Sequence, residues 1–173
     1  MNDSTWIWIA LGAIVGVWGW VRWRSPRPDF APLETSPDDP LMMAALQKAR
    51  ASLPEFRRLL GEARQSALVK VPFVSSSEQV EHLWAEVLGV VDGEDASSAV
   101  LEVRLVTPPV SHSGKIERLV RKRLDEIEDW QVRDAAGHVH GAYTQRAMFA
   151  IARRDGVRLP SQLREIEQEY PEI

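Results

Sequence analysis

An 18-residue apolar run near the amino terminus places the strongest constraint on what this chain can fold into. Residues 6–23 carry no charge before Arg22. As an α-helix, a run of this length would measure about 27 Å, at about 1.5 Å per residue. Because the hydrocarbon core of a bilayer is about 30 Å thick, this length and composition are typical of a transmembrane helix. We therefore expect residues 6–23 to span a membrane, after a short tail of residues 1–5.

Tryptophans stand at the two ends of this run. Indole side chains settle at the level of the lipid headgroups, so two groups of them indicate two membrane interfaces. The groups are Trp6 and Trp8 at one end and Trp18, Trp20 and Trp23 at the other. A cleaved signal peptide has a basic start and a small-residue cleavage site, and neither is present here. We expect a retained anchor, with a cleaved signal and a buried soluble helix as the alternatives.

The charges that flank the run predict its orientation. Arg22, Arg24 and Arg27 follow it, and no basic residue precedes it. Because basic residues are retained on the cytoplasmic side, we expect the amino terminus outside and the carboxyl-terminal domain in the cytoplasm, at the inner (cytoplasmic) membrane. Gly12 and Gly16 have the G-x-x-x-G spacing that lets two membrane helices approach closely, which would give a homodimer. The alternative is that these glycines only fit beside bulky tryptophans.

The composition of the remainder excludes several classes of function. Beyond Pro28 there are 24 acidic and 18 basic residues, a poor balance for binding a phosphate backbone, so we expect no nucleic-acid partner. The chain has no cysteine, which excludes disulfides, thiolate metal sites and a cysteine nucleophile. It also lacks phosphate-loop, dinucleotide-binding and zinc-hydrolase signatures, so we expect no cofactor.

Two helices are predicted after a proline-rich linker of residues 24–38. Asp39 followed by Pro40 has the pattern of a helix start. Ser52 and Glu55 have the spacing of a capping box, which predicts a second short helix that ends at Gly61. The apolar stripe of the first helix consists of Met42, Ala45, Leu46, Ala49 and Leu53.

The next segments have the period of strands. Residues 67–73, 81–91 and 99–106 are rich in β-formers or alternate in polarity, and a hairpin is expected to turn at residues 135–137. A helix is predicted from Thr144 to Gly156, followed by a charged tail, residues 157–173. Residues 115–124 are ambiguous. Their apolar spacing favours a helix, whereas their Lys and Arg residues are also typical of an edge strand.

Five motifs in this order resemble those of domain-of-unknown-function family 2314, a bacterial family. The motifs read DDPLMMAALQKARASLPEF, KVPF, EHLWAEV, IEDW and HGAYTQRAMF, and the domain they define covers residues 39–156. The resemblance implies a strand at residues 119–124, and it implies no activity. The chain departs from the family pattern between Asp92 and Lys115, which lacks a glycine-rich entry, and at Ala142, where the family has a second glycine. The motif positions are His82, Trp84, Glu86, Asp129, Trp130, Gly141, Tyr143, Thr144 and Arg146.

The fold class that follows is α+β. We expect amino-terminal helices packed on a mostly antiparallel sheet, preceded by a single transmembrane helix. At one corner, Asp129 is expected to cap backbone N–H groups while Trp130 fills the core. Thr144 is expected to be the N-cap of the late helix.

Few residues have a pattern that points to chemistry. His138 and His140 are weak candidates for a metal pair, since no third ligand is indicated. His82 and Glu86 would lie about 13 Å apart on a straight strand, too far for one proton relay, and Trp84 between them indicates a half-buried face. No acid is positioned to orient His112 between Ser111 and Ser113, so a hydrolytic triad is not supported.

We therefore expect a membrane-anchored cytoplasmic module that binds a protein or peptide, with an enzymatic role open but disfavoured. The expected partners are the membrane, an unidentified protein and a second copy of the chain. The alternative is a small enzyme or ligand sensor with a pocket near Trp84, Trp130, His140, Tyr143 and Arg146.

Overall fold

The computed structural model describes residues 36, 38–91, 99–113 and 117–170. The expected membrane span, its tryptophan and arginine flanks and the Gly12–Gly16 pair lie outside these residues. Among the helices that are described, none has the length and apolar character needed to cross a membrane.

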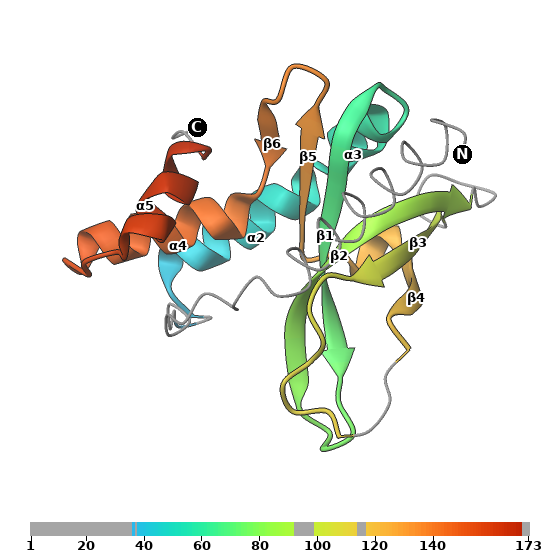
Figure 1. The fold of residues 1–173 in the computed structure, drawn as a ribbon, viewed down its shortest axis with the longest axis horizontal. Helices are drawn as coiled ribbons and strands as arrows, with labels where there is room; N and C mark the ends of the chain where they lie inside the picture. The colour runs from blue at the N-terminus through green and yellow to red at the C-terminus, as the bar shows by residue number, and fades with distance from the viewer. Residues whose placement is uncertain (1–35, 37, 92–98, 114–116, 171–173) are drawn as a thin grey trace, which may run out of the picture. The chain divides into compact units, whose positions relative to one another are not determined.

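The described residues contain six strands that form one antiparallel sheet (Figure 1). The strand order is β4-β3-β2-β1-β5-β6, so the long β1–β2 hairpin lies at the centre. The expected mostly antiparallel sheet is confirmed. The strands are β1 (Arg64–Val74), β2 (Val80–Val91), β3 (Val100–Leu105), β4 (Leu119–Arg123), β5 (Asp129–Asp134) and β6 (Val139–Gly141).

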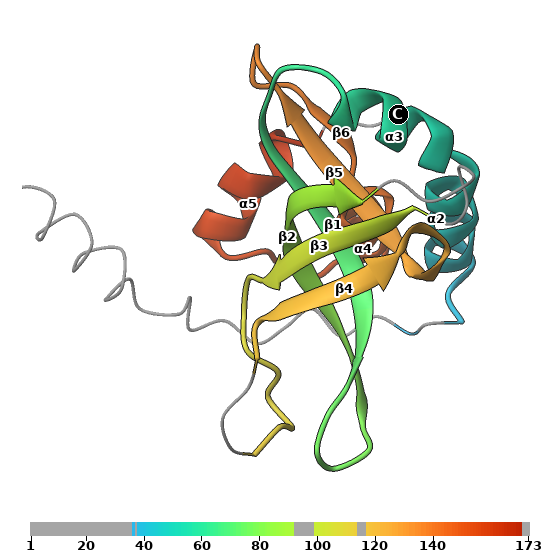
Figure 2. The ribbon, with the colours of Figure 1, turned by 90° about the vertical axis from the view of Figure 1, so that its right-hand side faces the viewer.

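Helices precede and follow the strands. They are α2 (Pro40–Ala51), α3 (Leu53–Leu60), α4 (Tyr143–Arg154) and α5 (Ser161–Gln168), with a 3₁₀ turn, η1 (Leu124–Glu126). Figure 2 shows α2 and α3 on one side of β1 and β5, and α5 on the other side. The expected helix start is confirmed, because Asp39 Oδ1 accepts a hydrogen bond from the Leu41 N–H at 2.9 Å. Met42, Ala45 and Ala49 of the predicted stripe are buried.

The capping box predicted at Ser52 is wrong. No side-chain bond from Ser52 caps α3, and its backbone, with φ −96° and ψ 9°, lacks the extended conformation of an N-cap. The reason is that Ser52 also ends α2, which leaves no extended residue between the two helices. Its hydroxyl instead donates to the Ala49 carbonyl at 3.0 Å and accepts from the Trp130 indole N–H at 3.0 Å.

β4 resolves the ambiguous segment as an edge strand. The helix favoured by apolar spacing is wrong there, and the strand implied by the family resemblance is confirmed. β4 pairs with β3 so that Val120 lies opposite the buried Val103. On the other face, the Arg121 guanidinium lies 2.7 Å from Glu102 of β3. Arg121 thus points away from the core, whereas Lys122 lies opposite the buried Leu101 on the same face as Val120; both cations belong to the outermost strand.

The core lies between the helices and one face of the sheet. Trp130 is 0 % exposed and stacks on Phe56 of α3, with ring centroids 5.2 Å apart. From β2, Ala85 and Val87 point into this core, as the alternation predicts, while Trp84 lies half-buried on the opposite face. The core therefore ties α2 and α3 to β5, the strand that leads into the hairpin before α4.

Candidate functional site

A buried carboxylate fixes the start of α4. Asp129 has no exposed surface, and it accepts hydrogen bonds from the N–H groups of Trp130 (2.8 Å), Tyr143 (3.2 Å) and Thr144 (2.7 Å). The Thr144 hydroxyl donates a fourth bond, at 2.6 Å. Burial raises the pKa of Asp129, and the bonds from Thr144 oppose that rise. The capping role expected for Asp129 is thus confirmed, and it acts on the first turn of a helix.

The N-cap role expected for Thr144 is wrong. Thr144 lies inside the first turn of α4, and Ala142 occupies the N-cap position without a side-chain cap bond. The reason is the turn between β6 and α4, where Gly141 (φ 72°) and Ala142 (φ 56°) both have positive φ. This tight turn starts the helix at Tyr143, one residue before Thr144. The Tyr143 side chain is thereby directed toward α2. The Trp130 ring, which comes from β5, meets the Tyr143 ring edge-on, with ring centroids 5.9 Å apart.

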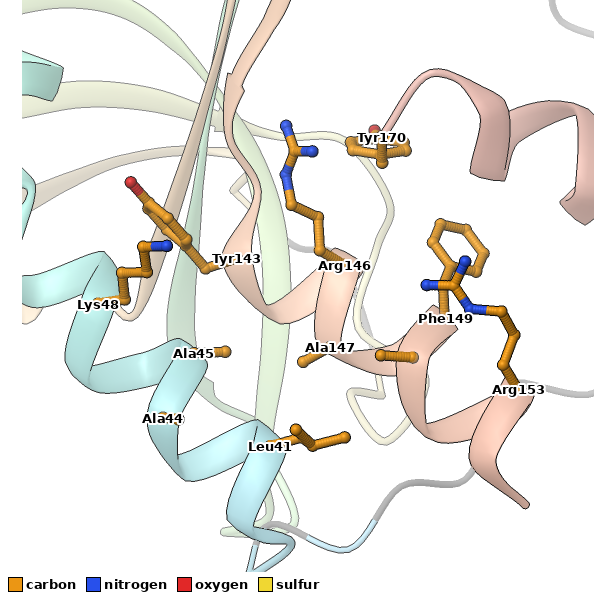
Figure 3. A pocket seen from close by; sticks show the side chains of 11 residues that line it. Leu41, Ala44, Ala45, Lys48, Tyr143, Arg146, Ala147, Phe149, Arg153 and Tyr170 are labelled. Carbon is orange, nitrogen blue, oxygen red and sulfur yellow. The ribbon is translucent and has the colours of Figure 1, made fainter. Parts of the chain in front are cut away.

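A cleft of about 330 Å³ lies between α2 and α4 (Figure 3). Small side chains form its floor, and aromatic rings and cations surround them. Among the described residues that line it, none carries a carboxylate. The lining residues are Leu41, Ala44, Ala45 and Lys48 of α2, Tyr143, Arg146, Ala147, Phe149, Ala150 and Arg153 of α4, and Tyr170.

Two cations of the cleft lie over aromatic rings. Lys48 Nζ is 5.6 Å from the centroid of the Tyr143 ring, and the Arg146 guanidinium is 5.7 Å from that of Tyr170. Arg146 also donates to the carbonyl oxygens of Gly141 (2.9 Å) and Val139 (3.0 Å). Burial lowers the pKa of Arg146, but a guanidinium stays charged throughout the physiological range. These contacts hold the positive charge at a fixed place in the wall of the cleft.

Tyr170 forms one wall of the cleft from outside α4. Its hydroxyl donates to Gln131 Oε1 at 2.9 Å, and its ring centroid lies 6.0 Å from that of Phe149. Burial raises the pKa of the Tyr170 phenol, which is therefore neutral at physiological pH. The segment is held in place by ion pairs of Glu169 with Arg133 and of Glu167 with Arg153, the second at 3.4 Å. Tyr170 was not among the residues predicted from the sequence to line a pocket; its one signal there is that it is an aromatic residue in a charged tail.

The residues of the pocket predicted for an enzyme or sensor are not brought together. Tyr143 and Arg146 line the cleft, but Trp130 is part of the core. Trp84 lies on the sheet face opposite to that of Trp130. His140 contacts Asp134 at the β5–β6 hairpin.

His138 and His140 converge on one carboxylate. His140 Nε2 lies 3.0 Å and His138 Nδ1 3.3 Å from Asp134 Oδ2. The bond with His140, followed by the bonds with His138, holds the pKa of Asp134 well below its usual range. The described part of the chain contains no group of three His, Asp or Glu residues suited to hold a metal ion. Both histidines therefore bind the Asp134 carboxylate at the turn of the β5–β6 hairpin.

The polar motif residues of β2 have separate partners. His82 Nδ1 lies 2.7 Å from Glu128, and Glu86 lies 2.6 Å from the Arg104 guanidinium. Each pair joins β2 to a neighbouring segment, so the two residues do not share a reaction centre.

The Ser111–His112–Ser113 segment is a loop fastened to the tip of the β1–β2 hairpin. Glu81 accepts hydrogen bonds from the N–H groups of Val110 (2.8 Å) and Ser111 (2.7 Å). His112 Nδ1 accepts from the Ser76 N–H at 3.2 Å, and Ser113 N–H donates to Ser76 Oγ at 2.9 Å. Glu81, the acid near this loop, therefore binds the backbone of the loop and does not orient the His112 imidazole.

Comparisons with known proteins give one match. A family model described as "Uncharacterized protein conserved in bacteria (DUF2314)" matches residues 39–155. No curated protein and no solved structure was found to match the chain. The matched region runs from the N-cap of α2 to the end of α4, so it contains both helices that form the cleft. α5 and Tyr170 lie beyond it.

Proposed function

Because this chain belongs to the DUF2314 family of uncharacterised bacterial proteins, whose description gives no activity, we propose a function from its cleft. The domain is a non-enzymatic module that binds a segment of another protein between α2 and α4. The observation that carries this proposal is the make-up of the cleft: an alanine floor, three rings and three cations in about 330 Å³. Apolar surface with a few placed polar groups is the usual character of a binding site.

The side chains of the cleft favour binding over proton transfer. Lys48, Arg146 and Arg153 are cations at neutral pH and can hold an anionic group. Tyr170 has a raised pKa, so its phenol stays protonated. Ala44, Ala45, Ala147 and Ala150 leave room between the helices for an apolar side chain of the partner.

Photo-crosslinking in the cleft tests this proposal. A photoreactive amino acid at Ala44, which is exposed and lines the cleft, is expected to capture the partner in intact cells. The same group at Met43 is the matched control, because Met43 is 50 % exposed on the opposite face of α2. A higher adduct yield at position 44 than at 43, reduced by Lys48→Glu, supports the proposal. Equal yields at both positions, or no adduct at position 44, would contradict it.

The proposal includes a membrane anchor at residues 6–23. Its support is the length of the uncharged run, the tryptophans at its two ends and the arginines that follow. Tethering would hold the cleft close to the membrane and raise its effective concentration for partners located there.

A topology experiment checks the anchor. A reporter that is active only in the cytoplasm, fused after Ile173, is expected to be active, and the chain is expected to remain in membranes after alkaline extraction. Deletion of residues 6–23 should release the protein into the supernatant and serves as the control. Activity of a fused reporter that works only outside the cytoplasm would overturn the orientation. Extraction of the intact chain would overturn the anchor.

A further inference from the structure

We infer that β4 is a second binding site, where an extended segment of another protein adds an antiparallel strand to the six-stranded sheet. The segment carries an acidic residue opposite Lys122 and an apolar residue opposite Val120. This inference goes beyond the proposed function, because three strands separate β4 from β5, the strand that contacts α2 beside the cleft. An edge strand presents a row of backbone N–H and C=O groups, and a peptide can bind by pairing with them.

The pairing with β3 determines which backbone groups of β4 point outward. The Leu105 N–H donates to the Arg118 carbonyl at 2.9 Å. Because bonded and outward-facing residues alternate along an antiparallel pair, the backbone groups of Leu119, Arg121 and Arg123 point away from β3. Figure 2 shows β4 at the border of the sheet, beyond β3. These outward groups therefore form the edge of the sheet.

Part of this edge is open to a partner. Glu126 closes one end, since its carboxylate accepts a hydrogen bond from the Arg123 N–H at 3.0 Å. Between the residues that the structure describes, no hydrogen bond involves the outward groups of Leu119 or Arg121. Leu119 is 54 % exposed, and the Arg121 side chain is 73 % exposed. Each of these two residues therefore offers one N–H and one C=O to an added strand.

The opposite edge of the sheet is closed. The His138 carbonyl bonds to the Asp134 N–H of β5, so by the same alternation the carbonyl oxygens of Val139 and Gly141 face outward from β6. Both of these oxygens accept hydrogen bonds from the Arg146 guanidinium, at 3.0 and 2.9 Å. β4 is therefore the edge at which a strand can be added.

The side chains of β4 specify the partner. Val120 packs against the core and is only partly buried, so an apolar residue opposite it would extend the core. Lys122 lies on the same face and forms no ion pair with any residue that the structure describes, so an acid opposite it would gain a cross-strand pair. The two partner positions are two residues apart and share one face of the added strand. Read from its amino end, the partner places an acid, any residue and two apolar residues opposite Lys122, Arg121, Val120 and Leu119.

Charge argues against a second copy of the chain at this edge. Two β4 strands paired with each other would bring together two runs of Arg121, Lys122 and Arg123. Like charges opposite each other destabilise a sheet, whereas an acid opposite Lys122 stabilises it.

A labelled peptide with the central sequence Glu-Thr-Val-Leu tests the inference, with the full chain in detergent micelles and fluorescence anisotropy as the readout. Opposite Arg121, the Thr N–H faces β4, and the Val N–H that follows points away from it. N-methylation of Thr is therefore expected to weaken binding at least about tenfold, and N-methylation of Val less than about twofold. Equal effects of the two methyl groups, or no binding of the unmodified peptide at about 1 mM, would overturn the inference.

Proline at position 121 tests the edge from the side of the protein. Arg121→Pro removes an outward N–H and no bond to β3, so the strand can remain in the sheet while peptide binding falls at least about tenfold. Arg121→Ala is the matched control, because it loses the same ion pair with Glu102 but keeps the N–H. If the two variants bind the peptide equally well, the backbone of β4 is not the binding site.

A charge exchange tests the acidic position. Lys122→Glu is expected to weaken binding of the peptide about fivefold, and a peptide with Lys in place of Glu should recover that loss. Failure of the exchange would overturn the acidic partner.

Two further outcomes separate this site from other occupants. Lys48→Glu, in the cleft, should leave the affinity of the peptide unchanged. A loss of affinity with Lys48→Glu would place the peptide in the cleft, which overturns this inference and leaves the proposed function standing. Self-association of the chain that Arg121→Pro abolishes, measured by sedimentation, would show that a second copy occupies the edge, and it would also overturn the inference.

Discussion

Replacement of Asp129 by alanine is expected to lower the free energy of unfolding by about 3–5 kcal/mol, because it leaves several buried donors without an acceptor. Three N–H groups and one hydroxyl donate to this carboxylate, and two of the N–H groups belong to the first turn of α4. The loss would therefore begin at the end of α4 that carries Tyr143. Pulse proteolysis of the full chain in urea measures it.

Two further variants test the explanation. Asp129→Asn has the same shape but turns one acceptor atom into a donor. Whichever way the amide is oriented, at least one backbone N–H then faces its NH₂ group, and we expect about 2 kcal/mol of destabilisation. Asp39→Ala removes the N-cap of α2 together with an ion pair to Arg154, and it is expected to cost less than either change, since this site lies at the surface and water can reach the groups left behind. If Asp129→Ala cost no more than Asp39→Ala, the buried carboxylate would not be what holds α4.

Gly141→Ala is expected to cost about 2–5 kcal/mol, the sum of a left-handed backbone and a steric overlap in the core. Gly141 has φ 72°, and a Cβ there would lie 2.6 Å from Cε3 and 2.8 Å from Cζ3 of Trp130, as well as against the Trp130 carbonyl. The indole is 0 % exposed and stacked on Phe56, so it has no space to retreat. The free energy of unfolding, again from pulse proteolysis, checks this.

Gly156 supplies the matched control. It has φ 68°, and no atom lies within 4 Å of a Cβ built on it. Gly156→Ala should therefore show the backbone cost alone, about 1–2 kcal/mol. The difference between the two variants measures the overlap with Trp130. Equal costs at the two glycines would mean that the β6–α4 turn can move away from the core.

The elements of the fold followed largely from local patterns. Asp39–Pro40 predicted the start of α2, and alternation along β2 predicted the inward side of Ala85 and Val87. The failures were also local. Ser52 and Thr144 both have side chains suited to an N-cap, but the neighbouring element determines the backbone conformation at each. Ser52 is also the last residue of α2, and the positive φ of Ala142 starts α4 one residue before Thr144.

The cleft was less accessible to sequence reasoning. Tyr143 and Arg146 were predicted to line a pocket, and they do, but their partners were misplaced. Lys48 lies more than ninety residues earlier in the chain, and its place beside Tyr143 depends on how α2 packs on α4. Trp130 looked like a pocket residue because an aromatic side chain next to an acid fits a site and a core equally well. Only packing separates the two cases.

The wall that Tyr170 contributes has a consequence for how this protein can change. The scaffold of the cleft lies within residues 39–155, the part that identifies the family, whereas Tyr170 lies outside it. Tyr170 is also absent from the described cluster of core residues around Trp130. Substitutions along the carboxyl-terminal segment can therefore reshape one side of the cleft while the scaffold remains folded. One side of the cleft therefore depends on a segment that the family match does not include, while the rest of its lining lies within the matched region.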